Sequence, residues 1–273
     1  MIKIGIPVVD QHDLTYKCLN YLNANCSNPE SIEIIIIDNA SKDPYDALPS
    51  MPQKIRTSII RNKANRGYYW PLLQVVAGTT SADLVGLMHN DLFIYQANWD
   101  MILRDVFIQN GKLGMVGVCG SSEIDDRGGR GGGTMCNFRG QNGGQLQAHT
   151  GKRITDLQPA LILDSMFMVM RQPVVEALRI DDHITLCHFM DKLWPIRTLS
   201  AGFDIGILGL EVDHMGGKTA VELLARFEKD CERWCGQEYI SFEPGKASLA
   251  LYLESERRFL TEARERGYLP SSI

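Results

Sequence analysis

The chain has 273 residues, of which 44% are hydrophobic and 22% are charged, and its formal net charge at pH 7 is −5. This length suits one large domain or two small ones, no apolar run is long enough to span a membrane, and the negative charge argues against a general nucleic-acid-binding surface. The seven cysteines are irregularly spaced, and the chain starts without the apolar region of a signal peptide, so we expect reduced thiols and a cytoplasmic protein.

The first two predicted strands are joined by a helix. Residues 2–9 have the loose alternation of a strand, and residues 14–23 place apolar side chains at helical spacing, with Asp13 as the expected N-cap. Residues 32–37 are strongly β-branched and predict a central strand. This order of elements predicts a parallel sheet with a right-handed crossover.

The loop after the first strand excludes the common dinucleotide-binding arrangement. It reads Pro7-Val8-Val9-Asp10-Gln11 and lacks the glycines that hold a pyrophosphate, and the chain has no P-loop. If this sheet binds a nucleotide, another group must neutralise the phosphates. A divalent cation held by Asp91 would serve.

Asp91 ends the most informative stretch of the chain. Residues 84–88 are uncharged and mostly apolar, which predicts a strand buried on both faces, and His89, Asn90 and Asp91 follow at its carboxyl end. Open α/β sheets bind ligands at this edge. The alternative is that Asp91 only caps the next turn or helix.

The α/β alternation continues on both sides of this strand. The predicted elements are an edge strand at 59–60, a helix after Pro71, a helix over 99–107 and a strand over 115–119. Further along we predict a strand within 160–170, a helix from about 172, a loop at 181–183, a mainly helical stretch over 185–201 that Pro195 must kink or interrupt, and short strands at 203–208 and 211–214.

The alternation stops between residues 120 and 151, where two glycine-rich runs cannot build a packed core. A stretch of this length inside a compact domain predicts a mobile lid or substrate loop. Arginine–glycine runs also occur in nucleic-acid-binding tails, but two arginines without a repeat make that the weaker interpretation.

From residue 219 the chain is helical and charged, without a boundary that would let it fold alone. We therefore expect a main domain at 1–218 and a helical C-terminal extension at 219–273 packed on it. The two apolar faces of the extension favour this packing over a homodimer interface or contact with a membrane surface.

Eight short stretches, in this order, resemble the family 2 glycosyltransferases and the wider GT-A fold. They are residues 3–8, 34–43 (Ile-Ile-Ile-Ile-Asp-Asn-Ala-Ser-Lys-Asp), 65–68, 88–91 (Met-His-Asn-Asp), 164–171, 189–191, 201–203 and 212–217. The ordered set is fairly specific. The resemblance implies a Rossmann-like α/β fold with a mixed, mainly parallel sheet flanked by helices.

For the nucleotide, the resemblance implies contacts at the ends of several strands. Pro7 and Val8 lie where the family's first strand meets the base, and Asp38 matches the acidic residue that hydrogen-bonds uracil. The other residues implied near the nucleotide are Asn65, Arg66, Gly67, His89 and Asn90. Without the resemblance, Asp38 is better explained as an acceptor for turn amides.

For the metal, the resemblance places residues 89–91 at the D-x-D motif. Asp91 would then hold Mg²⁺ or Mn²⁺ against the donor diphosphate, with His214 as a second protein ligand. Oxygen ligands suit both ions, and an imidazole is better tolerated by Mn²⁺. By itself, His214 is more simply a satisfied core histidine.

For catalysis, Asp191 matches the general base of the family's E-D motif, which takes the proton of the acceptor hydroxyl. The implied reaction is an inverting transfer, of the hexosyl or N-acetylhexosaminyl class, from a nucleotide-sugar, with a UDP-sugar favoured, to a glycan or other hydroxyl acceptor. Alternatively, Asp191 is a solvated helix residue.

Two positions depart from the family pattern. His89 replaces the first aspartate of the D-x-D motif, and Met190 replaces the glutamate before the base. Both keep open a second hypothesis, a catalytically degenerate module that binds a nucleotide or a glycan. A sugar nucleotidylyltransferase is disfavoured because its glycine-rich, arginine-containing phosphate loop is absent after the first strand.

Overall fold

The structure is a computed structural model that describes residues 1–46, 54–126, 128–131, 133–139, 151–180, 189–215 and 246–270. The parts of the expected lid at 140–150, the loop at 181–183, the helix start at 185–188 and the tail at 219–245 lie outside these residues. Within the described part, no helix is both long and apolar enough to cross a membrane.

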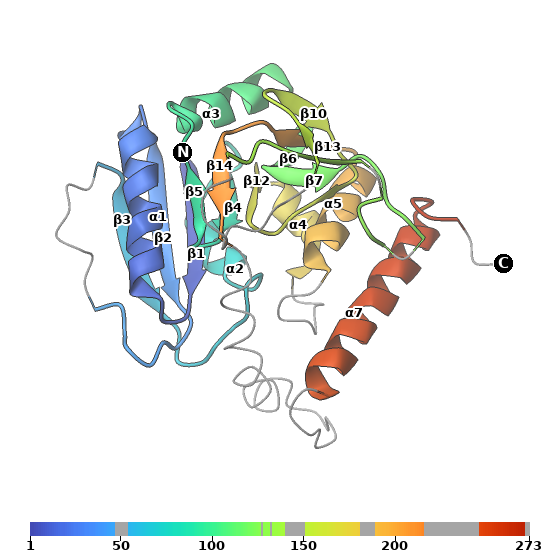
Figure 1. The fold of residues 1–273 in the computed structure, drawn as a ribbon, viewed down its shortest axis with the longest axis horizontal. Coiled ribbons are helices and arrows are strands. Elements are labelled where there is room, and N and C mark those ends of the chain that lie inside the picture. The colour runs from blue at the N-terminus through green and yellow to red at the C-terminus, as the bar shows by residue number, and fades with distance from the viewer. Residues whose placement is uncertain are drawn as a thin grey trace.

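An eight-stranded sheet forms the centre of the molecule (Figure 1). In spatial order its strands are β10 (Leu157–Pro159), β13 (Asp204–Leu208), β6 (Leu113–Gly117), β12 (Phe167–Arg171), β4 (Leu84–Met88), β1 (Ile2–Val8), β2 (Ile32–Asp38) and β3 (Arg56–Arg61). The run β4-β1-β2-β3 is parallel, whereas β12 is antiparallel to both β4 and β6. The expected mixed, mainly parallel sheet is confirmed, with β3 as an edge strand.

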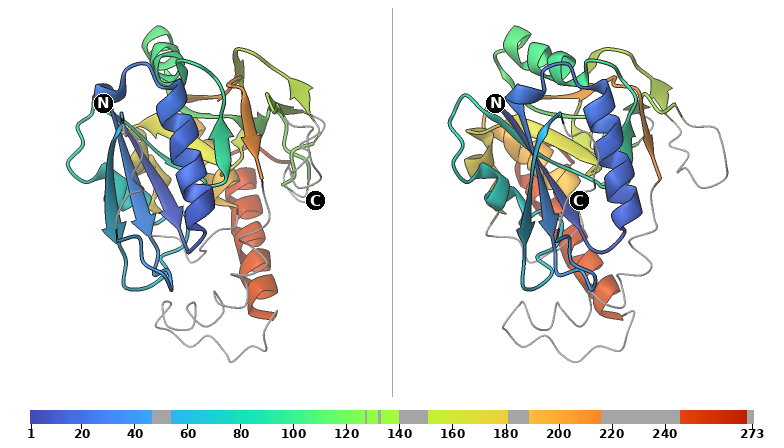
Figure 2. Two further views of the ribbon diagram at one scale, coloured as in Figure 1. Left: turned by 60° about the vertical axis from the view of Figure 1, so that its left-hand side comes forward. Right: turned by 90° about the vertical axis from the view of Figure 1, so that its left-hand side faces the viewer.

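Helices cover both faces of this sheet (Figure 2). Their bounds are α1 (His12–Asn25), α2 (Leu72–Val76), α3 (Trp99–Gln109), α4 (Val174–Leu178), α5 (Met190–Ser200) and α7 (Lys246–Glu265), with a 3₁₀ turn at Pro29–Ser31. In β2, Ile34 and Ile36 pack into one apolar cluster and Ile35 and Ile37 into the other. Because successive strand residues point to opposite faces, this uninterrupted isoleucine run requires cover on both sides.

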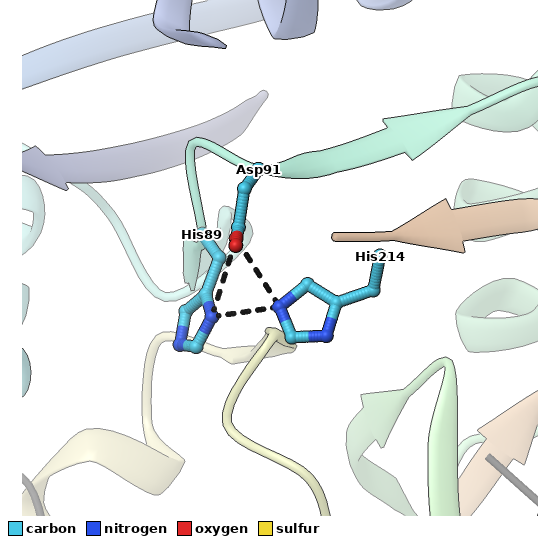
Figure 3. A group of neighbouring side chains, drawn as sticks. All are labelled: His89, Asp91 and His214. Carbon is cyan, nitrogen blue, oxygen red and sulfur yellow. Dashed lines mark hydrogen bonds and ion pairs between the residues drawn. The ribbon is translucent and has the colours of Figure 1, made fainter. Parts of the chain in front are cut away.

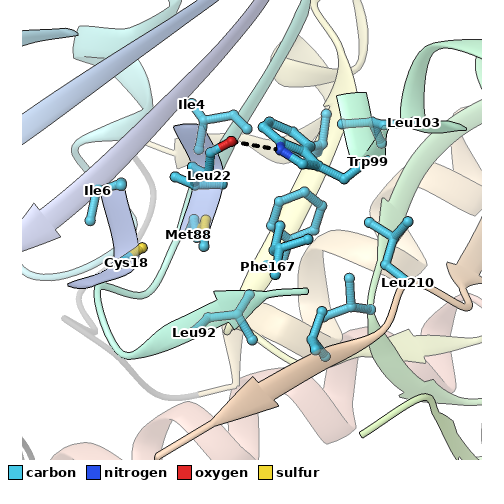
Figure 4. Packing of buried hydrophobic residues seen from close by; sticks show 14 of the residues in the cluster. Ile4, Ile6, Cys18, Leu22, Met88, Leu92, Trp99, Leu103, Phe167 and Leu210 are labelled. Atoms are coloured by element: carbon cyan, nitrogen blue, oxygen red, sulfur yellow. Dashed lines mark hydrogen bonds between the residues drawn. The ribbon is translucent and has the colours of Figure 1, made fainter. Parts of the chain in front are cut away.

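The face covered by α1 and α3 is centred on Trp99, which is fully buried (Figure 4). Its indole N–H donates a hydrogen bond to the Leu22 carbonyl oxygen at 3.2 Å. A buried tryptophan needs such a partner for its one polar group. This bond ties the start of α3 to α1.

Two smaller sheets lie beside the main one. The first has the order β11 (Ile162–Leu163), β7 (Cys119–Ser121), β8 (Thr134–Cys136) and β9 (Lys152–Arg153), and the second pairs β14 (Val212–His214) with β5 (Leu92–Ile94). The expected strand over 115–119 is therefore wrong in its bounds, since the chain leaves β6 at Gly117 and enters β7 at Cys119. Part of the glycine-rich stretch is regular, because it contributes β8.

The predicted N-cap of α1 is also wrong, and one of the two alternatives for Pro195 is excluded. Gln11, in a left-handed conformation, precedes α1, so Asp13 lies in the first turn of the helix and not at its N-cap. Pro195 does not interrupt α5, which continues from Met190 to Ser200. A proline in a helix removes one backbone hydrogen bond, and the burial of Trp194 and Ile196 on either side of it compensates by packing.

The described part of the C-terminal extension packs on the main sheet's second apolar cluster. Phe259 of α7 is fully buried there and stacks on Phe189, with ring centroids 5.8 Å apart. The Arg197 guanidinium of α5 donates to both carboxylate oxygens of Glu262 at 2.8 and 2.6 Å. These contacts join α7 to the helix that carries Asp191.

Candidate functional site

Asp91 lies in the short turn that connects β4 to β5, at the carboxyl end of the central parallel strands. β14 pairs antiparallel with β5, and this register sets His214 opposite Leu92, beside Asp91. Nε2 of His214 lies 3.1 Å from Oδ1 of Asp91 and 3.2 Å from Nδ1 of His89 (Figure 3). The three side chains point toward one another from two strands that are distant in sequence.

The charges of this cluster favour metal ligation. Burial opposes ionisation of Asp91, but the hydrogen bond from His214 and the charges of the two imidazoles outweigh it, so the pKa of Asp91 is lowered. Burial lowers the pKa of His89 to about 4. At neutral pH, Asp91 is therefore a carboxylate and His89 offers a neutral ring nitrogen.

One carboxylate oxygen and two imidazole nitrogens lie within 4.8 Å of one another, and among the described residues this is the group that fits a metal ion. The mixed oxygen and nitrogen donor set suits Mn²⁺ better than Mg²⁺, which prefers oxygen alone. His89 is thus a third candidate ligand, whereas the sequence assigned it to the nucleotide. The imidazole of His89 thus places a nitrogen that could bind a metal where the resemblance expects the first D-x-D aspartate.

Asp191 lies in the first turn of α5 and is partly exposed. Burial and the neighbouring carboxylate of Asp164 raise the pKa of Asp191 to about 6, against the opposing charges of Lys192 and Arg130. Met190, by contrast, is buried in the core. The residue that replaces the family's glutamate therefore packs inward and leaves Asp191 as the acidic group of this pair.

Two charged residues that the sequence did not assign to the site, Arg130 and Asp164, interact electrostatically with these groups. Arg130 makes a close ion pair with Asp164. The charge of Asp164 acts on His89 and His214 as well as on Asp191. Asp164 thus connects the metal-ligand cluster electrostatically to the expected base.

The position of Asp164 follows from the antiparallel strand β12, whose Phe167 pairs with Met88. The amino end of β12 therefore meets the carboxyl end of β4, and the amide of His89 donates to the Met166 carbonyl oxygen at 2.9 Å. Asp164 is the first residue of the family-like stretch 164–171, and this resemblance was the signal that could have placed it at the site. Arg130 had no such signal, since it stands in a glycine-rich run.

Tyr68 is a further residue at the site. Its ring meets the ring of His89 edge-on, with centroids 4.6 Å apart, and its hydroxyl donates to the Ser165 carbonyl oxygen at 2.7 Å. This ring contact limits the orientation of the His89 imidazole. The stretch 65–68 had been matched to the nucleotide, but the side chain of Tyr68 supports the metal-ligand cluster.

Asp38 is fully buried at the end of β2. Its carboxylate accepts hydrogen bonds from the amides of Ser41 at 2.8 Å and Tyr45 at 3.3 Å, and it forms a close ion pair with Arg61. Protein donors thus occupy both oxygens. This arrangement favours the turn-amide interpretation of Asp38 over direct contact with a base.

The remaining expected nucleotide residues surround the ends of β1 and β2. The Val8 carbonyl accepts from the amide of Asn39, which follows Asp38, at 2.8 Å. Asn39 also donates from its side chain to the carbonyl of Gly67, whose φ is +71°. The left-handed conformation of Gly67 favours glycine, and it fixes the loop against the end of β2.

Three of these residues have partners within the protein. Asn65 accepts a hydrogen bond from the Gly67 amide at 2.9 Å. The guanidinium of Arg66 lies over the Trp70 ring, 4.2 Å from its centroid. Asn90 points away from the cluster and donates to the hydroxyl of Thr15 at 3.1 Å. Pro7 is the half-buried penultimate residue of β1.

A family model for glycosyl transferase family 2 matches residues 3–179. No curated protein matches the chain. Among solved structures, mannosyltransferase PcManGT from Pyrobaculum calidifontis, in complex with GDP-Man and Mn²⁺, has a TM-score of 0.52 at 11% identity, covering 100% of this chain and 76% of that chain. GalNAc-T7 with UDP, GalNAc and Mn²⁺ has a TM-score of 0.61 at 10% identity, covering 100% and 53%.

A third structure, TarS from S. aureus, has a TM-score of 0.50 at 13% identity, covering 99% of this chain and 44% of that chain. The chain thus spans about half the length of GalNAc-T7 and less of TarS. At these identities the likeness shows a common fold, the GT-A fold, in agreement with the mixed sheet and its flanking helices.

Proposed function

The chain belongs to glycosyl transferase family 2, and from this membership we propose that it transfers a sugar from a nucleotide-sugar, with a UDP-sugar favoured, to an acceptor hydroxyl with inversion. The acceptor is proposed to be a glycan or another hydroxyl compound. The observation that carries the proposal is the cluster of His89, Asp91 and His214 at the carboxyl edge of the sheet. It supplies metal ligands where the fold lacks a phosphate-binding glycine loop.

The proposed metal ligands are His89, Asp91 and His214, and the proposed ion is Mn²⁺ or Mg²⁺. When bound there, the ion would act as a Lewis acid on the donor diphosphate, a stabilisation worth several kcal/mol in such sites. The residues around it do the positioning. Tyr68 and Asp91 hold the ring of His89, and the β5–β14 pairing holds His214.

Asp191 is proposed as the general base that accepts the proton of the acceptor hydroxyl. A carboxylate with a pKa of about 6 is a stronger base than an ordinary aspartate and is still ionised at neutral pH. In an inverting reaction the hydroxyl attacks on the face of the sugar away from the diphosphate. The base and the metal ligands should therefore lie on opposite sides of the sugar. Residues on separate elements allow this, and Asp191 is on α5 whereas Asp91 follows β4.

The residues proposed at the nucleotide are the end of β1, with Pro7 and Val8, and the loop that contains Asn65, Arg66 and Gly67. We propose an indirect role for Asp38, which orders the turn after β2. Asn90 faces Thr15, so we propose that it supports the position of the two cluster residues beside it.

The second candidate is a module that binds a nucleotide or a glycan without chemistry, and the departures at His89 and Met190 motivate it. The structure weakens both arguments. His89 remains a candidate metal ligand, and Met190 is buried in the core instead of facing the site. We therefore favour the enzyme.

The test is an assay of nucleoside diphosphate release from UDP-glucose, UDP-N-acetylglucosamine and GDP-mannose, with and without Mn²⁺ and simple glycoside acceptors. The variants are Asp91→Asn and Asp191→Asn, and the control is Asp105→Asn on the exposed face of α3. We expect Asp91→Asn to lose Mn²⁺-dependent UDP binding. We expect Asp191→Asn to bind the donor and turn over roughly 10²-fold more slowly.

Each hypothesis has its own contrary result. Full activity of Asp191→Asn would remove the assignment of the base and leave the transferase intact. Mn²⁺-linked binding of UDP without turnover of any donor would favour the binding module. Both conclusions require that the control variant Asp105→Asn is as active as the unchanged chain.

A further inference from the structure

Cys119 and Cys136 face each other close to the site. They are paired residues of the antiparallel strands β7 and β8, and both are buried. Their thiols are hydrogen-bonded to each other. Neither residue has a part in the proposed transfer, and neither is in a disulfide.

The backbone already has the geometry that a disulfide requires. Directly opposed residues in an antiparallel pair have Cα atoms about 4.5 or 5.5 Å apart. Both values lie inside the range of roughly 4.4–6.8 Å that disulfides span. The pairing of the two cysteines therefore places their Cα atoms within the range that a disulfide spans.

The surroundings of Cys136 favour its thiolate. The Cys119 thiol and the backbone amide of Phe138 form hydrogen bonds with Cys136, and the charge of Arg130 adds to them, so its pKa is lowered against the effect of burial. Burial instead raises the pKa of Cys18 and of Cys26. Because the thiolate is the nucleophile, this environment favours Cys136 over Cys119 as the attacking sulfur of the pair.

We propose that Cys119 and Cys136 form a redox-active dithiol that hydrogen peroxide converts into a disulfide. The Cys136 thiolate attacks one peroxide oxygen, the O–O bond breaks, and sulfenic acid and hydroxide are formed. The sulfur of Cys119 then attacks the sulfenic sulfur, its thiol proton leaves with the displaced oxygen as water, and the S–S bond forms. The two thiols lose two electrons, and the peroxide gains them.

This dithiol is connected to the site through Arg130 and Asp164. An Nη1 N–H of Arg130 points at Sγ of Cys119 at 3.7 Å, while its other nitrogen pairs with Asp164. The amide of Asp164 also donates to the Cys119 carbonyl at 2.8 Å. Oxidation removes the negative charge of the Cys136 thiolate, which interacts with the guanidinium of Arg130. We therefore expect oxidation to change the position of this guanidinium and, because its charge acts on Asp191, the pKa of Asp191. This last consequence rests on the proposed function, whereas the dithiol does not.

The test uses the full chain, reduced and then treated with increasing hydrogen peroxide, followed by alkylation of the remaining thiols and peptide mapping of all seven cysteines. We expect a linked peptide pair containing Cys119 and Cys136, reversible by dithiothreitol, at roughly tenfold less oxidant than modifies Cys18 or Cys26. In Cys119→Ser, which removes the resolving thiol but keeps a hydroxyl that can donate to Cys136, a dimedone reagent should label Cys136. The matched control Cys26→Ala should form the same linked pair as the unchanged chain.

The proposal is overturned if Cys119 and Cys136 remain alkylatable at oxidant levels that modify Cys18 or Cys26. It is also overturned if the linked pairs exclude them. These results are independent of glycosyl transfer. A disulfide that forms without changing donor turnover would keep the dithiol and remove its connection to the site.

Discussion

Nε2 of His214 lies 3.1 Å from Oδ1 of Asp91, and this contact exists because β14 pairs with β5. The two residues are far apart in the sequence. The antiparallel register, with His214 opposite Leu92, leaves the imidazole beside the turn that holds Asp91. The candidate metal site therefore depends on a pairing of two three-residue strands.

Replacing His214 by alanine tests this arrangement directly. The change removes one of two nitrogen ligands, so we expect at least roughly a tenfold loss of Mn²⁺ affinity. Calorimetric titration of the protein with Mn²⁺ alone measures it. His12→Ala, whose ring stacks on Tyr45 outside the cluster, is the control. Equal Mn²⁺ affinity in both variants would exclude His214 as a ligand.

The raised pKa of Asp191 predicts the acid limb of the activity profile. The base is ionised above about pH 6 and protonated below it. We expect kcat/KM to fall as the pH drops through about 6, where an ordinary aspartate would keep its charge down to about 4. A pH series measured at saturating Mn²⁺ checks this. A fall in kcat/KM that begins only below pH 5 would contradict the raised pKa of the base.

The same shift predicts a stability effect that needs no substrate. The folded pKa of about 6 exceeds the ordinary value of 3.8, so the folded chain binds more protons between these values and loses stability as the pH rises through them. The variant Asp191→Asn cannot ionise at this position, so it does not lose stability in this pH range. Its Tm should exceed that of the unchanged chain above pH 6, and the difference should vanish near pH 4. A difference independent of pH would show that Asp191 does not have a raised pKa.

Asp38→Asn separates the two interpretations of Asp38. The variant keeps an acceptor for Ser41 but loses the charge that Arg61 and the Tyr45 amide contact. We expect the free energy of unfolding to fall by about 2 kcal/mol. UDP affinity should change little for the folded protein. Denaturant unfolding and UDP titration measure the two effects, with exposed Asp46→Asn in the same loop as control. A loss of UDP affinity at unchanged stability would instead support direct contact with the base.

Gly86→Ala tests the close packing of β4 against β12. An added Cβ would overlap the backbone carbonyl oxygen of Met168, which a strand cannot move away cheaply. We expect a loss of about 3 kcal/mol or more in the free energy of unfolding. Gly111→Ala is the matched control, because nothing lies within 4 Å of its added Cβ. Comparable stability of the two variants would contradict the β4–β12 register.

The order of strands and helices was open to prediction because each is a local property. The isoleucine run of β2 and the apolar strand before His89 have periodicities that short-range sterics and burial produce wherever the chain leads. The short ordered stretches then sufficed to identify the family. The N-cap of α1 and the bounds of the strand expected at 115–119 were mispredicted, since a left-handed Gln11 and a change of sheet at Val118 have no periodic signal.

The sequence by itself determined the chemical groups available at the carboxyl edge of the sheet, including Asp91, His214 and Asp191. Only the tertiary structure decided that His89 joins the candidate metal ligands, that Asp38 pairs with Arg61, and that Arg130 reaches Asp164. The physical reason is that these outcomes depend on contacts between segments far apart in the chain. Such contacts follow from the pairing of β5 with β14 and of β4 with β12, and no local pattern encodes the register of strands that meet only after folding.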